Sequence, residues 1–240
     1  MIKYNSLILN GESSADFPFY VAVEEVPGLV RANKKDKLFK TDYANGAIKQ
    51  SVEAYDTISL KFIFYLHDVN RNELREFKKW LKDEGRLVRY DDPLIHYNYL
   101  SVEITSEVLD EVNGYQVTAE FECEPFEYEE EEEIDITNLQ SITNRTNAPM
   151  YPKLTIVASS SSPMYLKIGL HKMNFKKGLN GTYEIECKHN YQNIKNIRTG
   201  ELENGLATGP FFEIPKDGSW PIEKSSGFQS IKMLTRWGWR

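Results

Sequence analysis

The histidines and cysteines are the first residues to consider as metal ligands or nucleophiles. They are His67, His96, His171, His189, Cys123 and Cys187. A zinc site needs such ligands in clusters, and no two of these histidines fall within one helical turn or one tight hairpin. The two cysteines lie far apart, which favours buried, reduced thiols over a disulfide framework. The sequence therefore predicts no metal site and no cofactor.

Asp91 and Asp92 are paired carboxylates of the kind that a glycosidase places on either side of a sugar. Adjacent residues on an extended chain, however, point to opposite sides. Pro93 follows at once, and this order of residues is typical of a turn. The chain has no Gly-rich phosphate loop, no Gly-x-Ser-x-Gly and no His-Glu-x-x-His sequence. We therefore expect no catalytic residue and no enzyme activity, with a β-sandwich glycosidase as the enzyme alternative.

Aromatic residues could form a platform for a sugar ring. The chain has 14 Tyr, 12 Phe and 4 Trp. The candidates for a platform are Tyr97, Tyr99, Trp220, Trp237 and Trp239. The same residue types are also favoured in protein cores and protein–protein interfaces, and we prefer that explanation. A lectin-like module that binds cell-wall glycans is the alternative function that these residues leave open.

One segment predicts an amphipathic helix in a chain that otherwise has strand and turn patterns. Asn70 or Asn72 can cap its start, and Gly85 can end it. Its apolar face would carry Leu74, Phe77 and Leu81, and its charged face Arg75, Lys78, Lys79 and Lys82. The alternation over residues 51–67 predicts a long strand before the helix. Further strands are expected at 100–104 and 115–123, joined by a turn at Asn113-Gly114. The alternation of the second predicts apolar residues toward the core and the acids of 120–124 on the outward face.

The remaining segments suggest two β domains of opposite charge. Residues 32–50 are polar and predict a loop or a long hairpin arm, and the second half shows short strands separated by turn signals. Glu129 to Glu133 predict a solvated linker or arm. We place the boundary at 144/145, which gives residues 1–144 a net charge of −14 and residues 145–240 a net charge of +7. No apolar run reaches the length of a membrane span, and the N-terminus has no signal-peptide pattern.

The order of elements in residues 51–128 resembles the distal tail (Dit) protein family of siphophages that infect Gram-positive bacteria. The matching pieces are Thr57 to Leu66, Asn72-Glu73-Leu74-Arg75 to Leu81, Gly85-Arg86-Leu87, Asp91-Asp92-Pro93, Tyr97 and Tyr99, and Phe121-Glu122-Cys123-Glu124-Pro125-Phe126. The last piece is similar to the Phe-x-Cys-x-Pro-aromatic pattern of that family. The resemblance covers about the first 130 residues, and the remainder matches as a β-sandwich with an aromatic-rich end.

The resemblance implies a fold and an assembly. The fold would be mainly β, with an N-terminal β-sandwich or split-barrel domain that contains one α-helix (1–144) and a C-terminal galectin-like β-sandwich (145–240). The last few residues could pack back on the first domain. Such proteins form a hexameric ring at the distal end of the tail tube, and DNA passes through its channel without specific binding.

The resemblance also implies the neighbours of such a ring. The expected partners are the tail tube protein, a tail-associated lysin or fibre protein, and receptor-binding or other baseplate proteins, with no membrane. The protein would be part of the virion and would be made in the host bacterial cytoplasm. The chain leaves no room for a large inserted carbohydrate module.

Overall fold

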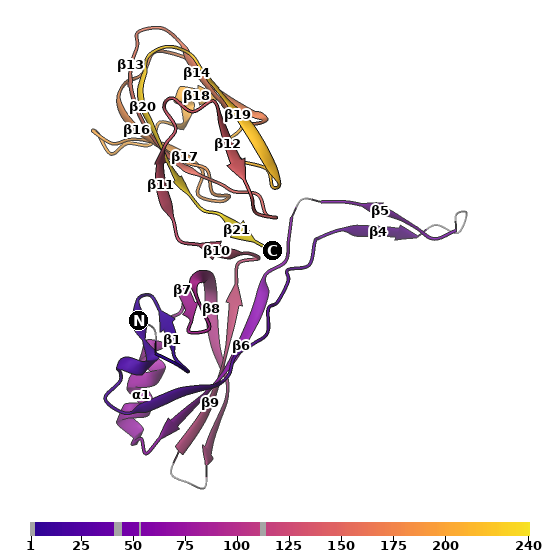
Figure 1. Cartoon of the computed structure of the whole chain (residues 1–240), viewed down its shortest axis with the longest axis vertical. Helices are drawn as coiled ribbons and strands as arrows, with labels where there is room; N and C mark the ends of the chain where they lie inside the picture. The colour runs from indigo at the N-terminus through magenta and orange to yellow at the C-terminus, as the bar shows by residue number, and fades with distance from the viewer. Residues whose placement is uncertain (1–2, 41–44, 53, 111–113) are drawn as a thin grey trace. The chain divides into compact units, whose positions relative to one another are not determined.

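The computed structural model describes residues 3–40, 45–52, 54–110 and 114–240, and the protein consists mainly of β-strands. It divides into two compact units, Met1–Tyr128 with Arg240, and Glu129–Trp239 (Figure 1). The described residues contain one α-helix, so the prediction of a mainly β fold with a single helix is confirmed. Within the described part of the chain, no helix is long and apolar enough to cross a membrane.

An antiparallel sheet forms the framework of the first unit. Its strands are β1 (Leu7–Leu9), β2 (Glu12–Ser13), β3 (Tyr20–Glu25), β6 (Ile58–His67), β7 (Gly85–Arg89), β8 (Asp92–Asp110) and β9 (Gly114–Cys123). They follow the order β2-β1-β7-β8-β9-β6-β3, and β10 (Glu127–Glu129) also pairs with β8. A short 3-10 helix, η1 (Ser14–Asp16), precedes β3. The strands β4 (Lys37–Lys40) and β5 (Ala47–Gln50) pair with each other in a separate hairpin, as expected for an arm.

The helix α1 (Arg71–Trp80) covers one face of this sheet, because its apolar side chains belong to the same core as the alternate residues of β6 and β9. Asn70 caps it, with its side chain accepting from the N–H groups of Asn72 and Glu73, and the Glu73 carboxylate accepts from the Asn70 N–H at 2.7 Å. This capping box provides acceptors for backbone N–H groups at the start of the helix that have no partner within the helix. Leu74, Phe77 and Trp80 are buried.

The helix ends at Trp80 and not at Gly85, so the predicted end was wrong. Leu81 already leaves the helical conformation and is buried as the C-cap residue. Gly85 instead opens β7 with a φ of 150°, where the Asn10 side chain occupies the space of a β-carbon. Asn10 uses that position to accept from the Arg86 N–H at 2.8 Å and to donate to the Glu84 carbonyl at 3.2 Å. The glycine is therefore required by the close approach of Asn10.

Replacing Gly85 with alanine should lower the free energy of unfolding by about 1–3 kcal/mol, because the new β-carbon adopts a disfavoured φ and displaces Asn10. Gly11→Ala is the matched control, since Gly11 also has a positive φ but has open space around it. Urea denaturation of both variants measures the difference. Equal losses in the two variants would contradict a role for the Asn10 contact.

Strand β8 is longer than the sequence predicted, and the expected turn lies one step earlier. The turn is formed by Tyr90 and Asp91, whereas Asp92 and Pro93 already belong to β8. The register shifts between Val88 and Arg89 and at two further points along β8, so the apolar alternation of the strand is interrupted. Because of these irregularities, strict alternation of apolar and polar residues does not predict the full length of the strand. The turn predicted at Asn113-Gly114 falls partly outside the described residues.

Two five-stranded antiparallel sheets form the second unit. The first has the order β11-β20-β13-β16-β17, and the second has the order β12-β19-β14-β15-β18. The strands are β11 (Glu132–Asp135), β12 (Ser141–Asn144), β13 (Lys153–Ser159), β14 (Met164–Ile168), β15 (His171–Phe175), β16 (Asn180–Glu186), β17 (Asn193–Asn196), β18 (Ala207–Thr208), β19 (Gly218–Lys224) and β20 (Phe228–Thr235), with the 3-10 helix η2 (Asn204–Leu206). A further short strand, β21 (Gly238–Trp239), lies outside these two sheets. One apolar core contains side chains from both sheets, which makes the unit a β-sandwich.

The chain divides after Tyr128, earlier than the boundary of 144/145 that the sequence suggested. Residues 129–144 belong to the second unit because β11 pairs with β20 and β12 pairs with β19. The acidic run Glu129–Glu133 is therefore not a solvated linker. Alternate acids of the run are held by cations of the same unit, in the pairs Glu129–Arg145 at 2.9 Å, Glu131–Arg236 at 3.0 Å and Glu133–Lys232 at 2.7 Å.

This division changes the charge balance that the sequence indicated. The first unit carries 23 Asp/Glu and 16 Lys/Arg, hence −7, and the second carries 13 of each, hence zero. The basic half seen in the sequence is neutralised by the acidic run that pairs with it. The last residue, Arg240, is grouped with the first unit, where its Nε donates to the Ala32 carbonyl at 3.1 Å and its guanidinium lies 4.5 Å from the Tyr55 ring centroid.

Candidate functional site

The paired carboxylates of the sequence analysis occupy structural positions. Asp91 accepts two hydrogen bonds from the nearly buried Arg89, at 2.9 Å from Nε and 2.6 Å from Nη2. These bonds hold the pKa of Asp91 below its ordinary value, which keeps the carboxylate charged as the partner of Arg89. Asp92 lies in β8, beyond the turn. This arrangement serves the β7–β8 turn, with both oxygens of the Asp91 carboxylate accepting from Arg89.

The other candidate ligands and nucleophiles are dispersed. His67 ends β6, His96 is buried in β8, His171 has its Nδ1 2.7 Å from the Phe211 carbonyl, and His189 stands against the Tyr151 ring. Cys123 and Cys187 are free and buried, as predicted, and burial raises the pKa of each thiol to about 12. Among the described residues, no group of three or more His, Cys, Asp or Glu side chains could hold a metal ion.

The tryptophans proposed as a sugar platform make contacts with their own unit. Trp220 and Trp237 pack against the core of the second unit, and the Trp220 Nε1 donates to the Pro215 carbonyl at 2.9 Å. The Trp239 Nε1 donates to the Glu129 carboxylate at 2.9 Å. Each of the three side chains is partly buried, and two of the ring donors are already satisfied. These contacts support the interpretation of the aromatic residues as structural.

The sheet of the first unit has a second, polar face, opposite the one that α1 covers. We use the term polar face for a set of polar side chains that point outward from β6, β8 and β9, namely Ser59, Lys61, Tyr65, Ser101, Glu103, Gln116, Glu120 and Glu122. Glu103 stands directly opposite Glu120 in the register of β8 and β9. Like charges in such a pair repel each other and lower the stability of a sheet. Lys61 opposes Glu120 from the other side.

The polar face therefore carries an excess of negative charge. Glu103 and Glu122 are exposed. The Ser59 hydroxyl donates to the Glu120 carboxylate at 2.5 Å, and the Thr57 hydroxyl donates to Glu122. The alternation of β9, with apolar residues toward the core and acids outward, had predicted this face correctly. The acidic side chains make no contact with the core, so core packing does not require acids at these positions. Their presence can therefore reflect a function of the outward face.

The arm formed by β4 and β5 is the second unusual surface of this unit (Figure 1). Leu38, Phe39 and Ile48 are 65%, 49% and 61% exposed, and Phe39 lies directly opposite Ile48 in the hairpin. Lysines flank them, and Lys49 pairs with Asp36 at 2.5 Å. Bulky apolar side chains on an exposed two-stranded ribbon gain nothing from the core of their own unit. An arm of this kind points to a contact with another molecule.

No family model matches the sequence, and no curated protein matches it. The structure superposes on the crystal structure of the SPP1 Dit (gp 19.1) protein, described as a paradigm of hub adsorption apparatus in Gram-positive infecting phages. The TM-score is 0.73 at 15% sequence identity, over 96% of this chain and 97% of that chain. The chain has the fold of a Dit protein.

This finding confirms, at the level of fold, the resemblance to distal tail proteins that the sequence indicated. The Dit fold extends over both units of the chain, whereas the sequence pieces that carried the resemblance lie between Thr57 and Phe126. The second unit offered no comparable pieces, because its short strands and turns are shared by many β-sandwiches. Its membership of the same fold is visible only in three dimensions.

Proposed function

We propose that the chain is a structural protein of a phage tail, which assembles as a hexameric ring at the distal end of the tail tube. The observation that carries this proposal is the shared fold with a hub adsorption apparatus protein over nearly the full length of both chains. A virion location follows from such a role. Synthesis in the cytoplasm of the bacterial host is part of the proposal.

The arm supports assembly into a closed ring. A ring needs a heterologous interface, in which one surface of each copy meets a different surface of the next. Leu38, Phe39 and Ile48 supply an exposed apolar surface on a projecting element, and such a surface is stable in water mainly when a partner covers it. In the ring, the arm of each subunit lies against its neighbour.

The polar face supports the passage of DNA. In the proposed ring this face lines the channel, with Glu103, Glu120 and Glu122 directed into it. Phosphate binding needs cationic side chains, so an acidic wall lets DNA pass without holding it. The repulsion between Glu103 and Glu120 lowers the stability of the sheet, and a channel wall that must not bind phosphate gives this costly pair a function.

The two faces of the proposed ring and its second unit each bind a different partner protein. The proposed ring joins the tail tube protein on one side and a tail-associated lysin or fibre protein on the other, and the galectin-like second unit anchors receptor-binding or other baseplate proteins. The role is one of assembly and not of catalysis. Asp91 paired with Arg89 and two thiols with a pKa of about 12 support this proposal.

Size-exclusion chromatography with light scattering tests the oligomer. The purified chain is expected to elute with a mass of about 167 kDa, six times its 27.8 kDa. Replacing both Leu38 and Phe39 with serine should shift the mass toward the monomer and leave the fold intact, because neither side chain is part of a core. Leu94→Ser is the control, since Leu94 is 80% exposed and lies off the arm. An arm variant that still forms the hexamer would refute the role of the arm.

A further inference from the structure

Strand β3 forms one edge of the sheet in the first unit, and part of that edge is open. It pairs with β6 on one side, and on the other side the Val23 N–H donates to the Asn5 carbonyl at 2.9 Å. Backbone groups alternate along an antiparallel strand, so the N–H and carbonyl of Val21 also face away from β6. Both groups therefore point to the side of β3 on which no other strand of the described residues pairs.

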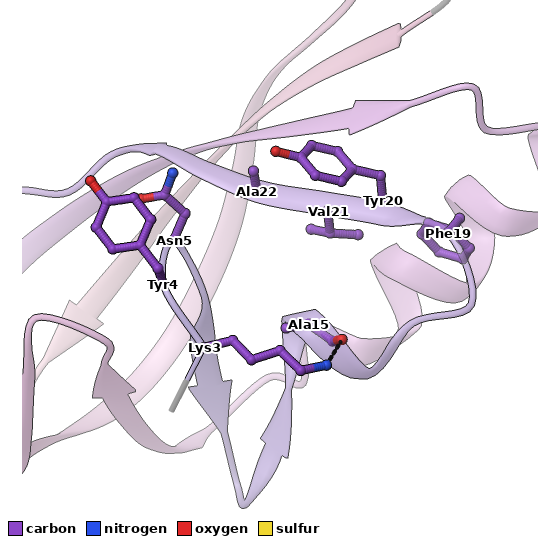
Figure 2. A pocket seen from close by; sticks show the side chains of 8 residues that line it. All are labelled: Lys3, Tyr4, Asn5, Ala15, Phe19, Tyr20, Val21 and Ala22. Atoms are coloured by element: carbon purple, nitrogen blue, oxygen red, sulfur yellow. Dashed lines mark hydrogen bonds between the residues drawn. The ribbon is translucent and has the colours of Figure 1, made fainter. Parts of the chain in front are cut away.

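A groove of about 300 Å³ lies along this open edge (Figure 2). We call it the edge groove, and its lining includes Lys3, Tyr4, Ala15, Phe19, Tyr20 and Val21. The Lys3 ammonium donates to the Ala15 carbonyl at 2.9 Å on the side of the groove opposite β3. Tyr4 and Tyr20 are 80% and 59% exposed, and although the Tyr4 ring centroid lies 5.0 Å from that of Tyr90, much of both rings can be contacted by an incoming side chain.

The combination of open main-chain groups and aromatic walls suits an extended peptide. In strand addition, main-chain hydrogen bonds supply affinity and pockets for alternate side chains supply specificity. The edge groove has room for the side chains of only a few residues, which matches a short strand.

Strand β4 has the complementary properties. It has the sequence Lys-Leu-Phe-Lys over Lys37–Lys40, and all four residues are exposed. Only one of its two edges is used, in the pairing with β5. Its lysines also complement the exposed acids that neighbour the groove lining in the sequence, namely Asp16 after Ala15 and the pair Glu24 and Glu25 beyond Ala22. The Asp16 carboxylate is 3.8 Å from the Lys3 ammonium and Glu24 accepts from Gln116, but Asp16, Glu24 and Glu25 are all exposed.

The geometry points to the occupant of the edge groove: strand β4 of a second copy of this chain adds to the open edge of β3, with its apolar side chains between Tyr4 and Tyr20. This inference rests on the ring proposed above and names the surface that receives the arm. The contact joins β4 of one copy to β3 of the next, so the two copies use different surfaces and the interface is heterologous. The same contact can then repeat from copy to copy until the ring closes.

Disulfide cross-linking tests the inference in the full-length protein. Tyr20→Cys and Phe39→Cys are introduced together, and the chain is oxidised and run on a non-reducing gel. The two native cysteines are buried and unreactive, so they give a clean background. We expect a ladder of covalent oligomers, and a mixture of the two single variants should give covalent dimers. The pair Leu94→Cys with Phe39→Cys is the control and should give no ladder.

A second variant blocks the edge groove. Ala15→Phe fills its wall with a ring, and it should reduce the yield of the Tyr20–Phe39 cross-link by about tenfold or more, with an unchanged thermal melt. A hexamer that forms while the Tyr20–Phe39 pair links no better than the Leu94 control would overturn this inference and leave the proposed function standing. A cross-link from Tyr20→Cys to a different tail protein would also overturn it. A chain that forms no oligomer at all would count against both.

Discussion

Replacing Phe77 with alanine is expected to lower the free energy of unfolding of the first unit by about 3–5 kcal/mol. Phe77 is fully buried, and its ring centroid lies 5.2 Å from that of Phe64, 5.7 Å from that of Trp80 and 6.0 Å from that of Phe17. Truncation removes these contacts and leaves a cavity between α1 and the sheet, and the surrounding rings can fill it only in part.

Hydrogen–deuterium exchange in the full chain measures this loss unit by unit. Protection should fall for peptides of β6 and β9, and peptides of the second unit should keep their wild-type rates. Lys79→Glu is the control on the same helix, because Lys79 is 81% exposed and its ion pair with the exposed Glu76 is long, at 3.9 Å. It should spare the fold. If Lys79→Glu destabilised the unit more than Phe77→Ala, the assignment of the two faces of α1 would be wrong.

The second large effect is expected at Arg236, which joins the acidic run to β16. Its Nη1 and Nη2 donate to Glu186 at 2.6 and 3.0 Å, and its Nε donates to Glu131 at 3.0 Å. The side chains of Arg236 and Glu186 are only 19% and 15% exposed. Arg236→Met should therefore cost about 1.5–3 kcal/mol at neutral pH, because it leaves the largely buried Glu186 carboxylate with fewer hydrogen bonds to satisfy it.

The pH dependence of this loss follows from the pKa of Glu186. Burial raises that pKa, but the hydrogen bonds from Arg236 and from the Lys188 N–H more than offset it, so the pKa lies below 4.5, its ordinary value. A lowered pKa stabilises the folded state above the ordinary value, and this contribution is lost as the pH falls through the lowered pKa. The second unit of the wild type should therefore lose stability below about pH 4.

Denaturation of the second unit at a series of pH values checks this expectation. The difference between the wild type and Arg236→Met should be largest near neutral pH and should narrow on acidification, as Glu186 becomes protonated in both. Lys232→Met is the control, because the Lys232–Glu133 pair is exposed on both sides and should contribute little. A difference that stayed constant from pH 7 to pH 3 would exclude the Arg236–Glu186 pair as its cause.

The parts of the fold that the sequence predicted best are those with a strong local period. Strand β6 alternates buried and outward residues from Ile58 to His67, and α1 places Leu74 and Phe77 on one face behind the Asn70 cap. Both signals arise within a few residues, so no knowledge of distant partners was needed. The outward acids of β9 were predicted for the same reason.

The errors arose where a distant residue decides the structure. Gly85 has the sequence signature of a helix C-cap, but its conformation is set by Asn10, seventy-five positions earlier. The acidic run predicts a linker until Arg145, Lys232 and Arg236 are brought beside it by the pairing of β11 with β20. The edge groove could not be predicted from the sequence either, because it depends on which strand lies at the edge of the sheet.

Electron microscopy of the purified chain at high concentration tests the central claim most directly. The proposed function predicts rings with six-fold symmetry and a central opening, and it predicts that rings are lost when Leu38 and Phe39 are both replaced with serine. The Leu94→Ser control should form the same rings as the wild type. Images that contain only monomers at every concentration, or closed particles of another symmetry, would contradict it.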